Sequence, residues 1–179
     1  MKKILFTILL PVCCNAQNFE IGINAGVSIN IYDKFFTPKR SVPYFLSGYI
    51  SFIRLHNFDF GVAYNHVYTF VSTNVANAFI DLKLGKKNNI IIGINAGINM
   101  FDDYYYAASP NGKNYYTISK RFDNSISCGL RLGYQKHFGK RFNLNLLINP
   151  TRTTVKTSNG INSYKLFYMP ITIGCGFRF

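Results

Sequence analysis

The chain has 179 residues, of which 48% are hydrophobic, 17% aromatic and 15% charged, with a formal net charge of +13. Aromatic residues are too frequent for a disordered chain, and the charged fraction lies below the roughly 25% of a typical soluble domain. A transmembrane helix needs about 20 consecutive apolar residues, whereas the longest strongly apolar run is Ile4 to Val12. The length fits a single domain, and the composition argues against a helical membrane protein.

The first 16 residues predict a cleaved export signal. Met1 to Lys3 is a positively charged start, Ile4 to Val12 is an apolar stretch too short to span a membrane, and Cys14 to Ala16 supplies small residues for signal peptidase. We expect cleavage before Gln17. Residues 17–179 then form a single mature domain.

The mature region alternates apolar and polar residues, which is typical of strands with one apolar and one polar face. In Phe19 to Asn30, apolar residues occupy the odd positions, and Glu, Gly, Asn and Ser occupy the even ones. The pattern predicts eight strands and no helix. The predicted strands are 19–30, 44–54, 58–70, 75–84, 90–100, 125–135, 142–149 and 167–179, with weaker alternation in 44–54 and 75–84.

The polar face of these strands carries mainly Gly, Asn, Ser and Thr, not the Lys and Glu of a water-facing surface. Small uncharged residues suit a narrow barrel interior, and a band of Ile, Leu and Phe suits surrounding lipid. Strands cross lipid only as a closed barrel, because every backbone polar group must be paired within the protein. We therefore predict an all-β fold, an eight-stranded antiparallel up-and-down transmembrane β-barrel.

The lengths of the connections between strands predict which end of the barrel carries short turns and which carries long loops. Short turns are expected at 54–57, 85–89 and 139–140, and longer loops at 31–43, 102–121 and 150–163. Short turns at the periplasmic end and long loops at the outer end are usual in such barrels. The connection at 71–74 is short where this scheme needs a long one. Pro170 cannot donate to a strand ladder, so we expect it at the outer rim.

The signal segment, the alternating strands and the C-terminal phenylalanine resemble small OmpA/OmpX-type outer-membrane barrels of Gram-negative bacteria. The most specific motif is the chain end, where Phe177 and Phe179 resemble the signal recognised by the barrel-assembly machinery. The resemblance implies an outer-membrane location, with lipid and lipopolysaccharide around the protein. Barrels of this kind serve many functions, so the resemblance implies a fold and not a task.

Six charged residues point inward by their position in the alternation: Glu20, Asp59, Asp81, Lys83, Arg131 and Arg178. Glu20 opens the first strand and Arg178 nearly ends the last, and these strands must be neighbours in a closed barrel. Unpaired charge in a narrow interior is costly, so we expect a paired network without a catalytic role. An eight-stranded interior is just wide enough for its own side chains, which argues against a wide channel.

The longest expected loop is rich in tyrosine, at Tyr104, Tyr105, Tyr106, Tyr115 and Tyr116. Tyrosine supplies rigid contact area in recognition surfaces, so the loop is a candidate for binding a protein partner. The alternative is a hairpin that extends above the membrane without a recognition role.

The basic residues are dispersed, and removal of Lys2 and Lys3 lowers the net charge from +13 to +11. An exported chain without a basic helix or stacking platform is not expected to bind nucleic acid. The phosphates of lipopolysaccharide are a more accessible anionic partner for the loop cations than nucleic acid is. The alternative is that these cations contact only water. These cations are Lys34, Lys39, Arg40, Lys113, Lys120, Arg121 and Lys165.

The remaining reactive residues do not assemble into an expected site. Cys128 and Cys175 fall on the sixth and eighth strands, about 10 Å apart at the ~4.8 Å strand spacing, so we expect two free thiols. His66 lacks a nearby serine and carboxylate, and neither a metal nor a cofactor is expected.

We therefore favour a non-enzymatic outer-membrane barrel with a structural or surface-interaction role. Three alternatives stay open. The first is a barrel subunit of a larger outer-membrane complex, suggested by the small residues Ala76 and Ala78 on the outer wall. The others are an exported soluble lipocalin-like barrel that binds an apolar ligand, and a lipid A-modifying enzyme that would depend on His66.

Overall fold

A computed structural model describes residues 19–32, 44–55, 57–68, 72–101, 105–108, 115–118, 123–156 and 163–179. The expected signal segment and Tyr104 lie outside these residues. In the described part of the chain, no helix is long and apolar enough to cross a membrane.

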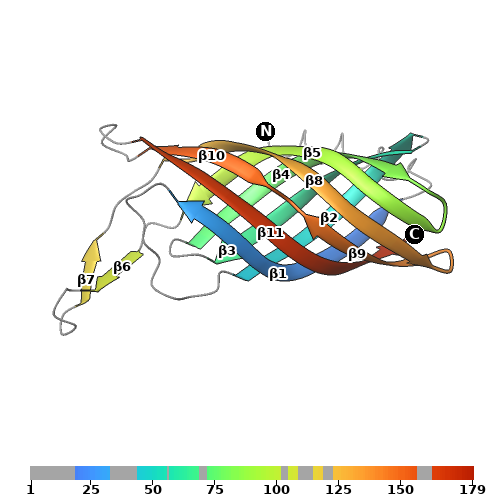
Figure 1. Ribbon diagram of the computed structural model, residues 1–179, viewed down its shortest axis with the longest axis horizontal. Coiled ribbons are helices and arrows are strands. Elements are labelled where there is room, and N and C mark those ends of the chain that lie inside the picture. The colour runs from blue at the N-terminus through green and yellow to red at the C-terminus, as the bar shows by residue number, and fades with distance from the viewer. Residues whose placement is uncertain are drawn as a thin grey trace, which may run out of the picture.

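Antiparallel strands close into a barrel with eight strand positions around its wall (Figure 1). The closing contact joins the first and last strands, where Glu20 lies opposite Arg178. The predicted eight-stranded antiparallel barrel is thus confirmed. The wall consists of β1 (Glu20–Tyr32), β2 (Tyr44–Leu55), β3 (Phe58–Tyr68), β4 (Ser72–Leu84), β5 (Asn88–Phe101), β8 (Ser125–Phe138), β9 (Phe142–Ile148) with β10 (Thr151–Lys156), and β11 (Ser163–Arg178).

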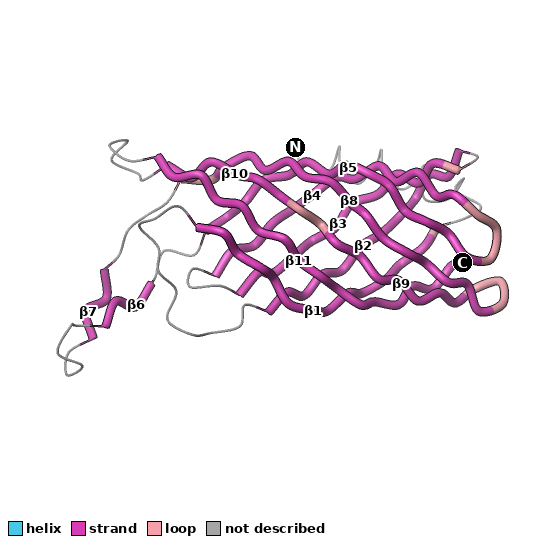
Figure 2. Tube along the Cα trace, viewed as in Figure 1, coloured by secondary structure: helices cyan, strands magenta, loops and turns pink. Residues whose placement is uncertain are grey.

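The seventh position of the wall is one strand in two pieces, β9 and β10, separated by Asn149 and Pro150 (Figure 2). Both pieces pair with β8 and β11, and the register continues across the break. The prediction that a loop begins at Pro150 was therefore wrong. The local pattern predicts a loop because proline cannot donate to the ladder, but the neighbouring strands carry the pairing past it.

Pro170 also lies elsewhere than expected. It is buried in the middle of β11, opposite Ser28 of β1, and not at the outer rim. Its carbonyl accepts a hydrogen bond from Asn149 N at 2.9 Å. In a regular ladder the carbonyl of Asn149 would accept a hydrogen bond from the backbone N–H of residue 170, but proline has no N–H. The Asn149 carbonyl instead accepts a hydrogen bond from Thr151 Oγ1 at 3.0 Å. A side-chain hydroxyl thus replaces the missing backbone donor.

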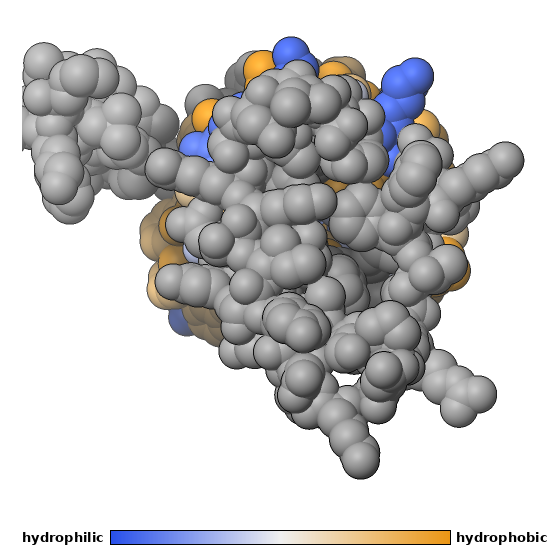
Figure 3. All heavy atoms as spheres, turned by 90° about the vertical axis from the view of Figure 1, so that its left-hand side faces the viewer, coloured by the Kyte–Doolittle hydropathy of each residue, from blue (hydrophilic) through white to orange (hydrophobic). Residues whose placement is uncertain are grey.

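The two faces of the wall are filled as the alternation predicts. Outward residues form a belt of Ile, Leu, Val, Phe and Tyr; Ile126, for example, is 79% exposed. Inward residues are mainly Asn, Ser, Thr and Gly, and Asn99 and Ser127 have no exposed surface. In the view from the loop end, the visible parts of the outer wall include hydrophobic residues in orange, with some hydrophilic residues in blue among them (Figure 3). This arrangement contradicts the soluble lipocalin-like alternative, which needs the apolar face inside.

The two weakly alternating strands place bulky residues inside. Phe45 and Tyr49 of β2, and Val75 and Phe79 of β4, are buried in the lumen. The outward positions between them include small residues such as Gly48. A bulge at Phe52, between the pairs that Ser51 and Ile53 make with β3, also shifts the alternation near the end of β2. Apolar residues on both faces explain why the sequence pattern was weak here.

The barrel has a turn end and a loop end. At the turn end, tight turns join β2 to β3, β4 to β5 and β8 to β9, and the first and last described residues lie there too (Figure 1). Gly85 and Gly139 in two of these turns have φ of 131° and 70°, which glycine adopts without strain. Beyond the loop end, β6 (Tyr105–Ala108) and β7 (Tyr115–Ile118) form a separate two-stranded sheet. The connection from β3 to β4 is short, as the sequence indicated.

Candidate functional site

A charged network fills the lumen near the turn end. Glu20 accepts hydrogen bonds at Oε1 from Tyr49 OH at 2.9 Å and from Gln135 Nε2 at 3.2 Å. Its Oε2 lies 3.3 Å from Arg178 Nη2, across the seam that closes the barrel. Gln135 Nε2 also donates to Asn143 Oδ1 at 2.9 Å. Four strands are thereby joined through one carboxylate.

Two further ion pairs use the other four charged residues predicted to face the lumen. Arg131 donates to both carboxylate oxygens of Asp81, at 2.8 Å and 3.1 Å, and its guanidinium lies 4.1 Å above the ring of Phe79. Lys83 Nζ lies 2.5 Å from Asp59. Each of the six predicted residues therefore has a partner of opposite charge inside the barrel. Loss of one partner from such a buried pair would leave an uncompensated charge in the lumen, which is costly.

The half of the lumen nearer the loop end is closed by neutral groups. Asn99 donates to Thr153 Oγ1 at 2.8 Å and to Ser125 Oγ at 3.3 Å, and Tyr168 OH donates to Asn99 Oδ1 at 3.3 Å. Beside them, Phe45, Val67 and Val75 form a buried apolar cluster against which Tyr168 packs. The lumen is thus occupied by side chains at both levels, as expected for eight strands.

Sequence reasoning missed the neutral members of these networks, above all Tyr49, Gln135 and Asn99. The alternation places Gln135 and Asn99 on the inward face, but it is too weak in 44–54 to identify Tyr49 as a lumen residue. The alternation could not pair them, because Glu20 and Gln135 are 115 residues apart in the chain.

On the outward face, His66 Nδ1 lies 2.8 Å from Asn74 Oδ1 on the adjacent strand. The partner in this contact is the side-chain amide of Asn74. Cys128 and Cys175 are free thiols, and β9 and β10 lie between their strands. Within the described residues, no group of three His, Cys, Asp or Glu side chains could hold a metal ion.

The tyrosine-rich segment includes the hairpin beyond the loop end. The backbone register places Tyr105 opposite Ile118, Tyr106 opposite Thr117, and Tyr116 opposite Ala107. Tyr115 pairs with Ala108. Of the loop cations proposed to meet lipopolysaccharide, Lys165 is exposed on β11, and the others lie outside the described residues.

Five phenylalanines lie next to one another around part of the turn end. Phe19 stacks on Phe179 with centroids 4.5 Å apart, and Phe179 meets Phe177 edge to face at 5.0 Å. Phe177 pairs with Phe142, whose ring lies 6.1 Å from Phe138. We call these five residues the turn-end girdle. Such girdles mark the interface between lipid and water in membrane barrels.

No protein-family model and no curated protein matches the sequence. The fold is similar to several solved structures of outer-membrane barrels. Neisserial surface protein A matches with a TM-score of 0.64 at 12% identity, over 90% of this chain and 97% of the other. The outer membrane protein OprG of Pseudomonas aeruginosa matches with a TM-score of 0.52 at 13% identity, over 90% and 95%. Ail, the attachment invasion locus protein of Yersinia pestis, matches with 0.52 at 12%, over 90% and 98%. The chain therefore has the fold of small outer-membrane barrels.

Proposed function

We propose that the chain is a non-enzymatic integral outer-membrane protein of a Gram-negative bacterium, which acts through its loop end. The observation that supports this proposal best is that the barrel is apolar on its outside and polar on its inside, the reverse of a soluble barrel. Its outer wall is a belt of exposed Ile, Leu and Phe, whereas its lumen holds paired charges and small polar residues. A wall of this kind suits lipid, and a filled lumen leaves the loops as the part available to a partner.

The similar structures support the same proposal at the level of the fold. One is named a surface protein and another an attachment protein. In this chain the β6–β7 hairpin, whose sequence includes four tyrosines, lies beyond the barrel (Figure 1). We propose that this segment meets a partner outside the cell, that the outer leaflet supplies lipopolysaccharide around the wall, and that Phe177 and Phe179 direct assembly.

Two epitope-tag insertions test both the location and the orientation. A tag between Asn111 and Gly112, in the segment that joins β6 to β7, should bind antibody on intact cells. A matched tag between Gly139 and Lys140, in the β8–β9 turn, should bind only after the outer membrane is permeabilised. The unheated protein should also migrate differently from the heated protein in SDS gels. Soluble protein without this shift would refute the proposal.

A second candidate function, as the subunit of a larger membrane complex, is favoured by the shape of the outer wall. Two adjacent depressions of about 570 Å³ and 640 Å³ share Ile23, Gly48 and Tyr64 in their linings. The small residues Ala76 and Ala78 line the larger of the two. A Cβ atom added at Gly48 would meet no atom within 4 Å, so Gly48→Leu fills the depression. If this candidate is correct, the wild type should migrate above its monomer mass in native gels, and the variant at that mass.

A further inference from the structure

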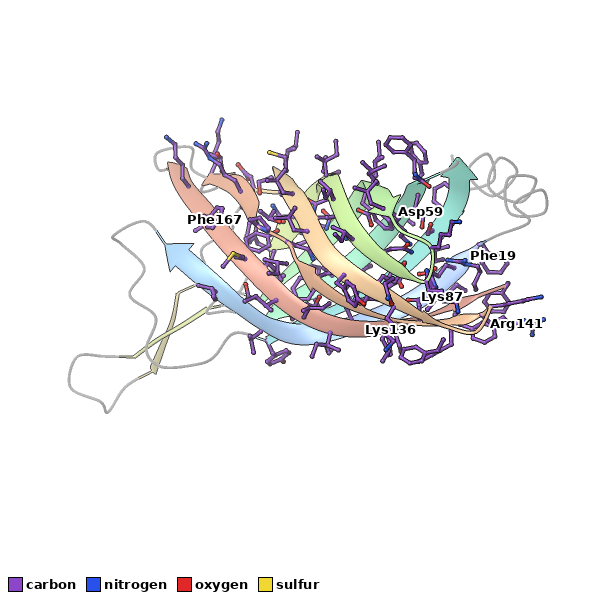
Figure 4. The ribbon with its side chains drawn as sticks, turned by 45° about the vertical axis from the view of Figure 1, so that its right-hand side comes forward. Phe19, Asp59, Lys87, Lys136, Arg141 and Phe167 are labelled. Carbon is purple, nitrogen blue, oxygen red and sulfur yellow. The ribbon has the colours of Figure 1, made fainter. Side chains whose placement is uncertain are left out.

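Five exposed cations gather at the turn end and form what we call the turn-end patch. They come from the β4–β5 turn, the β8–β9 turn and the end of β8, and are Lys86, Lys87, Lys136, Lys140 and Arg141. The backbone holds these segments together, because His137 N donates to Lys87 O at 2.9 Å. Figure 4 shows Lys87, Lys136 and Arg141 at the same end of the barrel as Phe19.

In the described part of the chain, no acidic side chain opposes this patch. The described acidic residues are Glu20, Asp59, Asp81 and Asp123. The first three are buried in the lumen and paired with Arg178, Lys83 and Arg131. Asp123 precedes β8 at the opposite end of the barrel. The five positive charges therefore add to one another at this surface, and the resulting field attracts a partner of negative charge.

The position of Lys136 indicates what kind of anion this is. Its side chain is exposed on the outward face of β8, beside the exposed rings of Tyr134 and Phe138. The ammonium lies 5.3 Å from the centroid of Phe138, a member of the turn-end girdle. A lysine on the apolar wall, level with interfacial aromatic rings, places its charge where lipid phosphates lie.

We propose that the turn-end patch binds the phosphate groups of anionic phospholipids in the adjoining leaflet. The proposal rests on the proposed function, since it requires that the wall is embedded in a membrane. Ammonium and guanidinium groups make charge-assisted hydrogen bonds to phosphate. Clusters of four to eight such cations beside a membrane-spanning segment are typical of anionic-lipid sites. Because Lys136 lies on the apolar wall, lipid fits the patch better than the peptidoglycan of the cell wall.

The test compares two variants that each lose three exposed cations. The patch variant carries Lys87→Gln, Lys136→Gln and Arg141→Gln, and the control carries Arg152→Gln, Lys156→Gln and Lys165→Gln near the loop end. Neither variant changes a lumen ion pair. The refolded full-length mature protein, in a neutral detergent, is titrated with phosphatidylglycerol or with zwitterionic phosphatidylcholine. Native mass spectrometry counts the lipids that stay bound.

We expect the wild type and the control to prefer phosphatidylglycerol, and the patch variant to lose at least tenfold in affinity for it. Each cation near an anionic surface raises the binding affinity by a factor of about five. The preference of the wild type should also weaken as salt rises above about 0.1 M, where screening acts within ~10 Å. This salt titration remains decisive if the patch variant does not refold.

Equal binding by all three proteins, or an equal loss in the control, would overturn the inference. Wild-type affinity for isolated peptidoglycan that falls in the patch variant, without a change in lipid binding, would also overturn it and favour the cell wall. The heat-dependent gel shift separates these outcomes from failure of the proposed function. If the wild type shows no gel shift on heating, the proposed membrane barrel is wrong. If all three proteins show the shift but lipid binding is not as expected, only the proposed lipid site is wrong.

Discussion

The ring of Tyr49 lies directly over Gly22, the residue that pairs with it on the neighbouring strand. A Cβ atom at Gly22 would overlap this ring. The same relationship recurs around the lumen, where a large side chain covers the glycine opposite it. Further examples are Phe79 over Gly61, Asp81 over Gly93, Asn77 over Gly97 and Asn24 over Gly174. Glycine therefore supplies the space that lets a narrow barrel hold aromatic and charged groups.

This relationship predicts a large effect of one added methyl group. Gly22→Ala should destabilise the barrel by about 1–3 kcal/mol, because it overfills a packed site and displaces Tyr49 from Glu20. Unfolding of the refolded protein in urea, followed by the gel shift, measures the change. Gly48→Ala is the matched control, since its methyl group would point into open space. Equal midpoints for the two variants would contradict the packing argument.

Breaking a lumen ion pair should cost more than removing an exposed charge. Asp81→Asn leaves Arg131 buried without its carboxylate, and we expect a loss of about 3–5 kcal/mol in the free energy of unfolding. Asp123→Asn, at an exposed position, should leave stability unchanged. Replacing Asp81 and Arg131 together by Leu and Met should recover part of the loss. If Asp81→Asn unfolds like the wild type, the pair contributes nothing to the fold.

The hydroxyl of Thr151 should matter most while residue 170 is proline. Thr151→Val removes the donor to the Asn149 carbonyl and should cost about 1–2 kcal/mol. In a Pro170→Ala background the cost should be smaller, because the new backbone N–H can donate to the same carbonyl. A double-mutant cycle in urea measures the coupling, with exposed Thr154→Val as the control. If Thr151→Val destabilises both backgrounds equally, the Thr151 hydroxyl does not replace the missing backbone N–H of residue 170.

Both cysteines of the mature chain should react as thiols. Denatured, unreduced protein treated with iodoacetamide should gain two adducts in its intact mass, because β9 and β10 separate the strands of Cys128 and Cys175. Prior reduction should add no further adduct. An unlabelled protein that gains two adducts only after reduction would be inconsistent with the register of the barrel.

The same spectrum tests the export signal. Protein purified from the membrane should begin at Gln17, since Cys14 to Ala16 forms the expected cleavage motif. A double change of Cys14 and Ala16 to Leu should leave the precursor uncleaved. A wild-type mass that retains the first 16 residues would refute the assignment of this segment.

Residues 21–26 and 92–97 have the same sequence, Ile-Gly-Ile-Asn-Ala-Gly, in two different strands. Their alternation identified the inward face correctly in both strands. In the structure, Gly22 and Gly93 each lie beneath a large side chain of a neighbour, and Asn24 covers Gly174. The two segments meet similar packing needs, but the identity of the covering side chain depends on which strand lies beside each one.

The sequence by itself determined which residues face the lumen and which face outward in the strongly alternating strands, but not for the bulky lumen residues Phe45 and Tyr49 of β2. Alternation is a local property of an extended chain, and it survives any choice of strand neighbours. It failed at Pro150 and Pro170, where local propensity predicts an end of pairing that the adjacent strands override.

Only the tertiary structure decided which lumen residues meet. Glu20, Tyr49, Gln135 and Arg178 come from four strands and share one site because closure of the barrel sets the register between distant strands. The turn-end patch arises in the same way, from turns that lie apart in the chain and are joined by the pairing of β5 with β8. Register and closure are properties of the whole barrel, so no segment of the sequence carries them alone.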